Sequence, residues 1–161
     1  IVNKKYDRKF FEDGIKKKYT QCWGVFLEFQ IHYILAKKKI FNNDAELFFI
    51  TGALIYNQNL IQKKNGELIN YRDEWWRSIT NLENKKGLNA MTISELTGIP
   101  RPTVIRKLKI LLKQKDTVKN KNNLYMFVRG PGYNEMNKIR LQNIESLSKT
   151  ISRINNIIFF S

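Results

Sequence analysis

TISELTGIPRPTVIRKLKILL, residues 92–112, has the parts of two short helices joined by a turn. Thr92 and Glu95 form a T-x-x-E capping box, which predicts the start of the first helix. Gly98 permits the positive φ at which many helices end, because it has no Cβ to clash. Pro100 favours the start of a second helix, since proline is tolerated at a helix N-terminus. The stretch therefore predicts a helix-turn-helix.

The second helix of this motif has two faces of different chemistry. Val104, Leu108, Leu111 and Leu112 recur on one side of this helix, which predicts that their face packs on a core. On the other face, arginine can donate two hydrogen bonds to guanine, isoleucine can contact a thymine methyl, and lysine suits phosphate oxygens. The candidate DNA contacts in the motif are Thr92, Arg101, Pro102, Thr103, Ile105, Arg106, Lys107, Lys109 and Lys113.

A β-hairpin, or wing, is predicted directly after the motif. Val118 and residues 124–128 have the apolar pattern of strands, and the polar residues 120–123 separate them. The candidate DNA contacts of this wing are Lys119, Lys121 and Asn122. Residues 91–130 carry nine Lys or Arg against two acids, so the motif and its hairpin are locally basic.

The whole chain is also strongly basic. Lys and Arg number 29 against 14 Asp and Glu, for a formal net charge of +15. This excess favours a polyanionic partner, with nucleic acid as the first candidate. A very AT-rich genome would enrich Lys, Asn and Ile through its codons alone, so charge without a motif does not establish DNA binding.

Residues 98–112, GIPRPTVIRKLKILL, resemble the turn and recognition helix of MarR-like and GntR-like bacterial regulators. The shared pattern is a Gly and an apolar residue, then Arg, a Thr-Val pair, a basic residue and spaced leucines. The resemblance implies a mainly α winged helix-turn-helix with a small β-hairpin wing, flanking N- and C-terminal helices, and dimeric binding to a two-fold operator. Such regulators usually have a Gly before the first wing strand, where this chain has Lys115 and Asp116.

Helices are predicted before the motif as well. Residues 1–18 are expected to form a short helix or an arm, and residues 20–39 a helix so broadly apolar that it is buried on several sides. The stripe on that helix consists of Trp23, Phe26, Leu27, Gln30 and Ile34. Asn43 or Asp44 is expected to cap a helix that runs to about residue 59. The core face of this next helix is expected to be Leu47, Phe48, Thr51, Leu54 and Ile55.

Residues 60–90 give weaker signals. A turn is expected at residues 64–66, and a short helix that includes Trp75 and Trp76 is expected at residues 71–84. A group of aromatic side chains lines either an effector pocket or the core: Trp23, Phe26, Phe29, Tyr33, Phe48, Phe49, Tyr56, Trp75 and Trp76. A small-molecule effector has no other support in the sequence.

The C-terminal region is predicted to be one long helix from about residue 134. Ile144, Leu147, Ile151, Ile154 and Ile158 alternate steps of three and four, which is coiled-coil spacing. Their stripe is either a dimer seam or the packed face of a helix on its own domain. The expected domains are an N-terminal helical arm at residues 1–42, a winged helix-turn-helix at 43–132, and a C-terminal helix at 133–161.

Other functional classes lack their signatures. A single cysteine, Cys22, excludes an internal disulfide framework, and a single histidine, His32, leaves no zinc-binding cluster. No phosphate-binding loop, nucleophile elbow or paired metal ligands appear, so we expect no enzyme, no metal and no cofactor. No apolar run reaches the roughly 18 residues of a transmembrane helix and no signal peptide is visible, so we expect a cytoplasmic protein.

These observations predict a sequence-specific regulator of transcription that binds double-stranded DNA as a homodimer in the bacterial cytoplasm. The recognition helix is expected over about residues 100–112 and the wing over about residues 117–128. Two alternatives stay open, a winged-helix module for protein–protein interaction and an RNA-binding module. An apolar patch in place of the basic face would favour the first, and tighter binding to RNA than to duplex DNA would favour the second.

Overall fold

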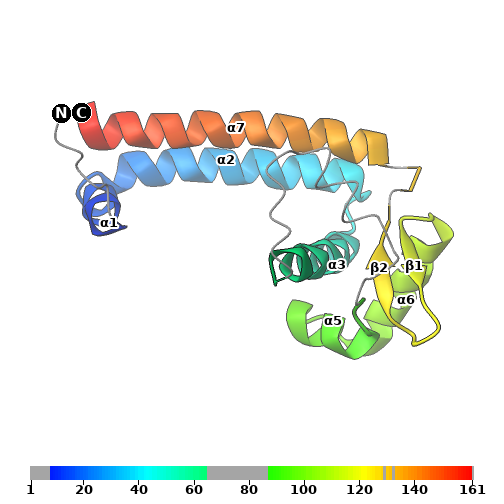
Figure 1. The fold of residues 1–161 in the computed structure, drawn as a ribbon. Helices are drawn as coiled ribbons and strands as arrows, with labels where there is room; N and C mark the ends of the chain where they lie inside the picture. The colour runs from blue at the N-terminus through cyan, green and yellow to red at the C-terminus, as the bar shows by residue number, and fades with distance from the viewer. Residues whose placement is uncertain (1–7, 65–86, 129, 132, 161) are drawn as a thin grey trace. The chain divides into compact units, whose positions relative to one another are not determined.

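The computed structural model describes residues 8–64, 87–128, 130–131 and 133–160 of the chain. The fold is mainly helical, with one small two-stranded antiparallel sheet (Figure 1). Its elements are α1 (Arg8–Lys17), α2 (Tyr19–Ile40), α3 (Ala45–Lys64), α5 (Ala90–Thr97), α6 (Arg101–Lys113), β1 (Thr117–Lys119), β2 (Tyr125–Phe127) and α7 (Tyr133–Phe160). The turn expected around Asn65 and the helix expected at residues 71–84 lie outside the described residues.

The chain divides into two compact units. One comprises Ile1–Lys37 with Asn137–Ser161 and is called the hairpin unit, and the other comprises Lys38–Met136 and is called the central unit. The hairpin unit holds α1 and most of α2 and α7. The central unit holds α3, α5, α6 and both strands, so it contains the whole predicted helix-turn-helix and its hairpin.

One apolar core lies among the elements of the central unit. α3 contacts α5, α6 and β2, and α6 also contacts β1. The buried core residues are Leu47, Ile50, Leu54, Leu88, Ile93, Ile99, Val104, Leu108, Leu111 and Phe127. Three of the four residues predicted to form the core face of α6 are among them, whereas Leu112 is only partly buried and lies outside this cluster. Burying one such side chain stabilises a fold by roughly 1.5–3 kcal/mol, so the core holds α6 firmly by one side.

The start of α3 is set by its N-cap, Asp44. The Leu47 N–H donates a hydrogen bond to Asp44 Oδ1 at 3.0 Å, so the structure selects Asp44 from the two expected caps. Leu47, Thr51 and Leu54 are buried on the predicted core face.

Two further residues of α3 are buried that the stripe pattern did not predict, Ile50 and Gln58. The Gln58 Nε2 donates a hydrogen bond to the Phe127 carbonyl oxygen at 3.1 Å, which ties α3 to β2. The pattern missed both because α3 is covered by two helices and a strand, so its buried arc is wider than one stripe.

The hairpin unit is built on α2 and α7, which run side by side in opposite directions (Figure 1). Cys22 and Val25 are the buried residues of α2, and burial raises the pKa of the Cys22 thiol. Trp23, Leu27 and Ile34 of the expected core stripe are exposed, so the expectation that α2 is buried on several sides is wrong. The reason is that α2 is apolar around most of its circumference, whereas α7 covers one side of it.

The N-terminal segment forms the short helix α1, which was one of its two expected forms. The rings of Phe10 and Phe11 have their centroids 5.3 and 6.3 Å from that of Phe159 in α7. A Cβ on Gly14 would lie 2.7 Å from Ile158 Cγ2, so glycine at this position lets α1 approach α7 closely. None of the described helices has both the length and the hydrophobicity needed to cross a lipid bilayer.

Candidate nucleic-acid interface

The first helix of the motif, α5, begins earlier than predicted. Its N-cap is Asn89, whose Oδ1 accepts hydrogen bonds from the Thr92 N–H at 2.9 Å and from the Thr92 hydroxyl at 3.2 Å. The expected capping box of Thr92 and Glu95 is therefore wrong, and Thr92 lies inside the first turn of α5. Asparagine is as good an N-cap as threonine or better, so the helix extends back to it.

The turn between α5 and α6 is held by local hydrogen bonds. Gly98 has a φ of 70° and ends α5 in the left-handed conformation, as expected. The Ser94 hydroxyl donates to the Ile99 carbonyl oxygen at 2.6 Å, while the Ile99 side chain is buried in the core. Pro100 then precedes the first residue of α6, and Pro102 lies in its first turn. These contacts fix the angle at which α6 leaves α5.

The outer side of α6 carries a basic stripe. Its exposed residues at spacings of three and four are Pro102, Arg106, Lys109 and Lys113, which therefore share one face of the helix. Thr103 and Ile105 are half-buried at the two edges of this stripe. Arg101 is exposed too, but as the first residue of α6 it lies at the end of the helix and outside the stripe.

Lys107 does not belong to the exposed surface, contrary to the sequence-based prediction. Its side chain is only 8% exposed, and its Nζ donates a hydrogen bond to Asp44 Oδ2 and lies 3.1 Å from Glu46 Oε2. It is therefore placed to anchor α6 to the start of α3 rather than to contact a phosphate. Helical spacing in the sequence could have predicted this burial, because position 107 follows Val104 by three residues and precedes Leu111 by four, within the core face.

Both partners of this ion pair stay charged at neutral pH. The hydrogen bond to Asp44 is the main cause of a raised Lys107 pKa. Burial alone would raise the pKa of Asp44, but the hydrogen bonds from Lys107 and the Leu47 N–H outweigh it, so the pKa of Asp44 is lowered. Each shift favours the ionised form of its group.

Arg106 forms a weaker ion pair than Lys107 does. Its Nη2 lies 3.6 Å from Glu46 Oε2, and the Arg106 side chain is largely open to solvent whereas that of Glu46 is partly exposed. Exposed pairs of this kind stabilise a protein by at most about 1 kcal/mol. Arg106 can therefore leave Glu46 for a stronger acceptor.

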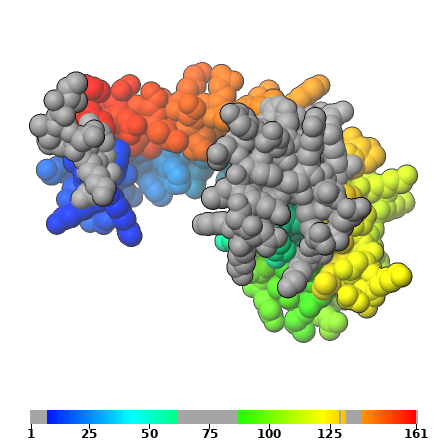
Figure 2. Space-filling view, viewed as in Figure 1, coloured from blue at the N-terminus to red at the C-terminus, as the bar shows by residue number. Residues whose placement is uncertain are grey.

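The β-hairpin formed by β1 and β2 follows α6 within the central unit, and Figure 2 shows it in yellow at the surface. β1 and β2 are antiparallel with Val118 opposite Met126 and Lys119 opposite Tyr125, close to the predicted strands. The Lys119 Nζ lies 5.5 Å from the centroid of the Tyr125 ring. Lys119, Lys121 and Asn122 are all exposed, so each can reach a partner.

The turn of the hairpin is built from asparagines. Asn120 Oδ1 accepts hydrogen bonds from the N–H groups of Asn122 and Leu124, at 2.9 and 3.0 Å. Asn123 has a φ of 60°, a conformation that asparagine tolerates better than most residues. The tip is thus held locally by one side chain, with Lys121 exposed on it.

Lys115 lies just before β1, at the position where regulators of the resembled families usually have a glycine. This residue has a φ of 60°, which is the left-handed conformation that the expected glycine would adopt without strain. The N–H groups of Lys115 and Asp116 bond to the carbonyl oxygens of Leu112 and Leu111, both at 3.1 Å, and so close the end of α6. The backbone therefore turns as a glycine would allow, although the sequence has lysine.

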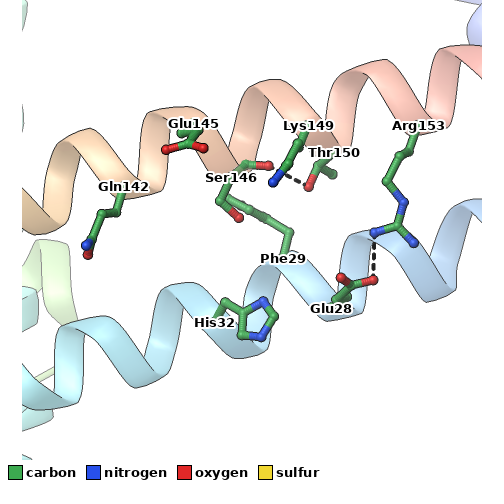
Figure 3. Close-up of a pocket in the computed structure, with 9 residues that line it drawn as sticks. All are labelled: Glu28, Phe29, His32, Gln142, Glu145, Ser146, Lys149, Thr150 and Arg153. Carbon is green, nitrogen blue, oxygen red and sulfur yellow. Dashed lines mark hydrogen bonds and ion pairs between the residues drawn. The ribbon is translucent and has the colours of Figure 1, made fainter.

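A polar cleft of about 320 Å³ lies in the hairpin unit between α2 and α7 (Figure 3). Arg153 Nη1 of α7 donates a hydrogen bond to Glu28 Oε2 of α2 at 2.7 Å across it. Of the aromatic residues considered for an effector pocket that the structure describes, Phe29 alone lines this cleft, while Trp75 and Trp76 lie outside the described residues. Within the described parts of the chain, no group of three His, Cys, Asp or Glu side chains is placed to hold a metal ion.

Comparisons with protein-family models, with curated proteins and with solved structures find no match to this chain.

Proposed function

We propose that the central unit is a winged helix-turn-helix that binds double-stranded DNA in a sequence-specific manner and regulates transcription. The observation that carries this proposal is the basic stripe on α6, which faces outward because the opposite side of the helix is locked in the core. A protein of this kind reads DNA by placing such a helix in the major groove.

The order and packing of the elements support the proposal. α3, α5 and α6 enclose one core, and the β1–β2 hairpin follows α6 directly. A major groove about 12 Å wide admits one α-helix. α6 enters as a rigid body, because the buried ion pair of Lys107 and the core contacts both fix it to α3.

The exposed side chains divide into two roles. Arg106 lies in the second turn of α6, near enough to its start to meet base edges, and can bond guanine through two N–H groups. Lys109 and Lys113 on α6, and Lys119 and Lys121 on the hairpin, suit phosphate oxygens on the flanking backbone. Lys107 has no part in the proposed contact.

The two alternative functions have less support. A protein-interaction module would present an apolar patch on the outer side of α6, where the exposed side chains are mostly basic. Sequence-specific RNA modules commonly stack unpaired bases on exposed aromatic rings. Over residues 101–127, all of which the structure describes, the exposed side chains include no aromatic ring.

Selection of bound fragments from a random duplex library tests the proposal with the full chain. One enriched motif is expected, and recovered fragments no more alike than the input would reject sequence-specific binding. The double variant Arg106→Ala, Lys109→Ala should lose the enrichment. Its matched control, Lys138→Ala with Lys149→Ala, removes the same charge from exposed positions of α7 and should keep it.

A competition assay separates DNA from RNA. The selected duplex is labelled, and unlabelled hairpin or single-stranded RNA is added at rising concentration. We expect the unlabelled duplex to displace the label at lower concentration than either RNA. The opposite order would favour the RNA-binding alternative.

A further inference from the structure

Asp116 lies in the link between α6 and β1, where its backbone connects several parts of the central unit. Its N–H group donates a hydrogen bond to the Leu111 carbonyl oxygen at 3.1 Å, near the end of α6. Its own carbonyl oxygen accepts a hydrogen bond from the Val128 N–H at 3.0 Å, just after β2. These bonds join α6 to the β-hairpin base, a name given to the group of Asp116, Thr117, Val128 and Gly130.

The carboxyl group of Asp116 is enclosed in this base. Its Oδ1 atom is buried, and no donor among the described residues forms a hydrogen bond with it. Gly130 approaches the same atom so closely that a Cβ on this glycine would overlap Oδ1 and would lie 2.6 Å from the Lys115 carbonyl oxygen. The chain after β2 can therefore close over the carboxyl group only because position 130 is glycine.

Among the described side chains, no opposite charge pairs with the Asp116 carboxylate, although the chain has 29 Lys and Arg. Lys113 and Lys115 precede it at the end of α6, and Lys119 and Tyr125 are the titratable residues of β1 and β2. The three lysines are exposed rather than packed on the carboxyl group. The charge of Asp116 is therefore uncompensated within the β-hairpin base.

Burial of this kind opposes ionisation. An oxygen that carries charge and leaves water without gaining a partner costs much more free energy than a neutral carboxyl group does. Burial accordingly raises the pKa of Asp116 above its ordinary value of 3.8. The contribution of Asp116 to the closed base is thus complete below 3.8 and is lost as pH rises through the raised pKa.

The β-hairpin base holds a second buried polar atom. The Thr117 Oγ1 is buried and has no hydrogen-bond partner among the described residues. A buried polar group that lacks a partner is paid for in stability, and contact with water removes this cost. Opening of the base lets water reach both side chains, which lowers the free energy needed for a local opening at this place.

We propose that Asp116 positions the β1–β2 hairpin in a pH-dependent way, because its neutral carboxyl group stays enclosed beneath Gly130 whereas its carboxylate favours an opened base in contact with water. Opening breaks the hydrogen bond between Val128 and Asp116, which holds the hairpin to the end of α6. This device belongs to the fold and does not depend on DNA binding. Its consequence for Lys119 and Lys121, which are less firmly positioned for phosphate as pH rises, rests on the proposed function.

Hydrogen exchange of the full chain without DNA, followed by NMR, tests the proposal. The Val128 N–H reports on the base, and the Leu88 N–H, which bonds to the Tyr125 carbonyl oxygen at 3.0 Å, is the reference elsewhere on the hairpin. The protection factor of Val128 relative to Leu88 should rise at least about fivefold from about pH 7 to about pH 4, which corresponds to about 1 kcal/mol. A ratio that does not change with pH would overturn the proposal.

Two variants assign the effect to Asp116. Asp116→Asn keeps the shape of the side chain but has no charge to lose, so its ratio should stay at the acid value of the unmodified protein over the whole pH range. Glu95→Gln removes the same charge from an exposed position of α5 and should keep the pH dependence. An Asp116→Asn protein whose ratio still changes with pH would reject the assignment.

A titration of the Asp116 carboxyl carbon in the unmodified protein needs no variant and is therefore independent of any folding defect. Its midpoint should lie above 3.8 and coincide with the midpoint of the change in Val128 protection. Two separate midpoints would show that another group controls the β-hairpin base.

Discussion

Lys107 of α6 donates a hydrogen bond to Asp44, the residue that caps α3, across 63 positions of sequence. One carboxylate thus serves two purposes, because Oδ1 accepts the Leu47 N–H and Oδ2 accepts the Lys107 ammonium group. The first turn of α3 and the position of α6 are therefore coupled. Since α6 carries the proposed DNA contacts, the coupling connects stability with recognition.

Asp44→Ala is expected to lower the free energy of unfolding by more than the loss of an N-cap alone would. Loss of the cap costs about 1 kcal/mol, and removal of one partner from a buried ion pair costs about 3–5 kcal/mol. Because Asp44 is partly exposed and Glu46 remains near Lys107, we expect a total of about 2–4 kcal/mol. Urea unfolding followed by circular dichroism measures this loss of unfolding free energy.

The control for this variant is Glu12→Ala, which breaks exposed pairs with Arg8 and Lys16 on α1. Its effect should stay within about 0.5 kcal/mol. An Asp44→Ala protein as stable as Glu12→Ala would show that the Lys107 pair does not hold α6 in solution.

The Asp44 carboxylate should also make the free energy of unfolding depend on pH in the acid range. Its pKa is lowered on folding, so its contribution is present above the ordinary value of 3.8 and is lost as pH falls through the lowered value. Lys107 has a raised pKa, so its contribution is complete below 10.5 and is lost only as pH rises through the raised value. The difference in unfolding free energy between wild type and Asp44→Asn should therefore be constant near neutral pH and shrink below about pH 4. Urea titrations from pH 7 to strongly acid buffer measure it, and a difference that stays constant throughout would contradict the assignment.

Lys115→Gly is expected to stabilise the protein. Lys115 holds a φ of 60° at an exposed position, where a residue with a Cβ is strained by about 1–2 kcal/mol relative to glycine. Glycine loses more backbone entropy on folding, by about 0.5–1 kcal/mol, so the net gain should be about 0.5–1 kcal/mol. Thermal unfolding should show a higher midpoint.

Lys113→Gly is the matched control, because it removes the same charge two residues earlier, within the last turn of α6. Here glycine should destabilise the helix by up to about 1 kcal/mol. If both variants shifted the midpoint in the same direction, charge rather than backbone conformation would explain the result.

Arg106 and Lys121 should separate base reading from backbone contact. Arg106→Ala should weaken binding to a selected duplex by about 1–3 kcal/mol and affect random DNA much less, because a base contact carries discrimination. Lys121→Ala on the hairpin tip should weaken both DNAs about equally and reduce the slope of log affinity against log salt by about 0.9. Paired titrations at several salt concentrations measure both effects.

Both side chains are exposed, so neither change should alter the melting curve. Val104→Ala is the contrasting core variant and should lose stability and binding together. An Arg106→Ala protein with intact fold and unchanged preference for the selected duplex would show that α6 does not read the bases.

Local features of the central unit were predictable because they depend on neighbouring residues. Gly98 ends α5 as expected, since a positive φ suits a residue without a Cβ. Val104 and Leu108 are buried as expected, since helical spacing puts them on one face. Asn89 was missed as the cap of α5, because two acceptable caps stand close together in the sequence and the choice depends on which side chain reaches the free N–H groups.

The sequence by itself determined the two short helices joined by a turn, the hairpin after them and the basic character of α6, because turn chemistry, periodicity and charge are local properties. Only the tertiary structure decided that Lys107 is buried, since its partner Asp44 is distant in sequence and brought close by the core. Only the tertiary structure decided that Trp23 and Ile144 are exposed. A helical stripe records which side of a helix is apolar, whereas the neighbours that fold against it determine which part of that side is covered.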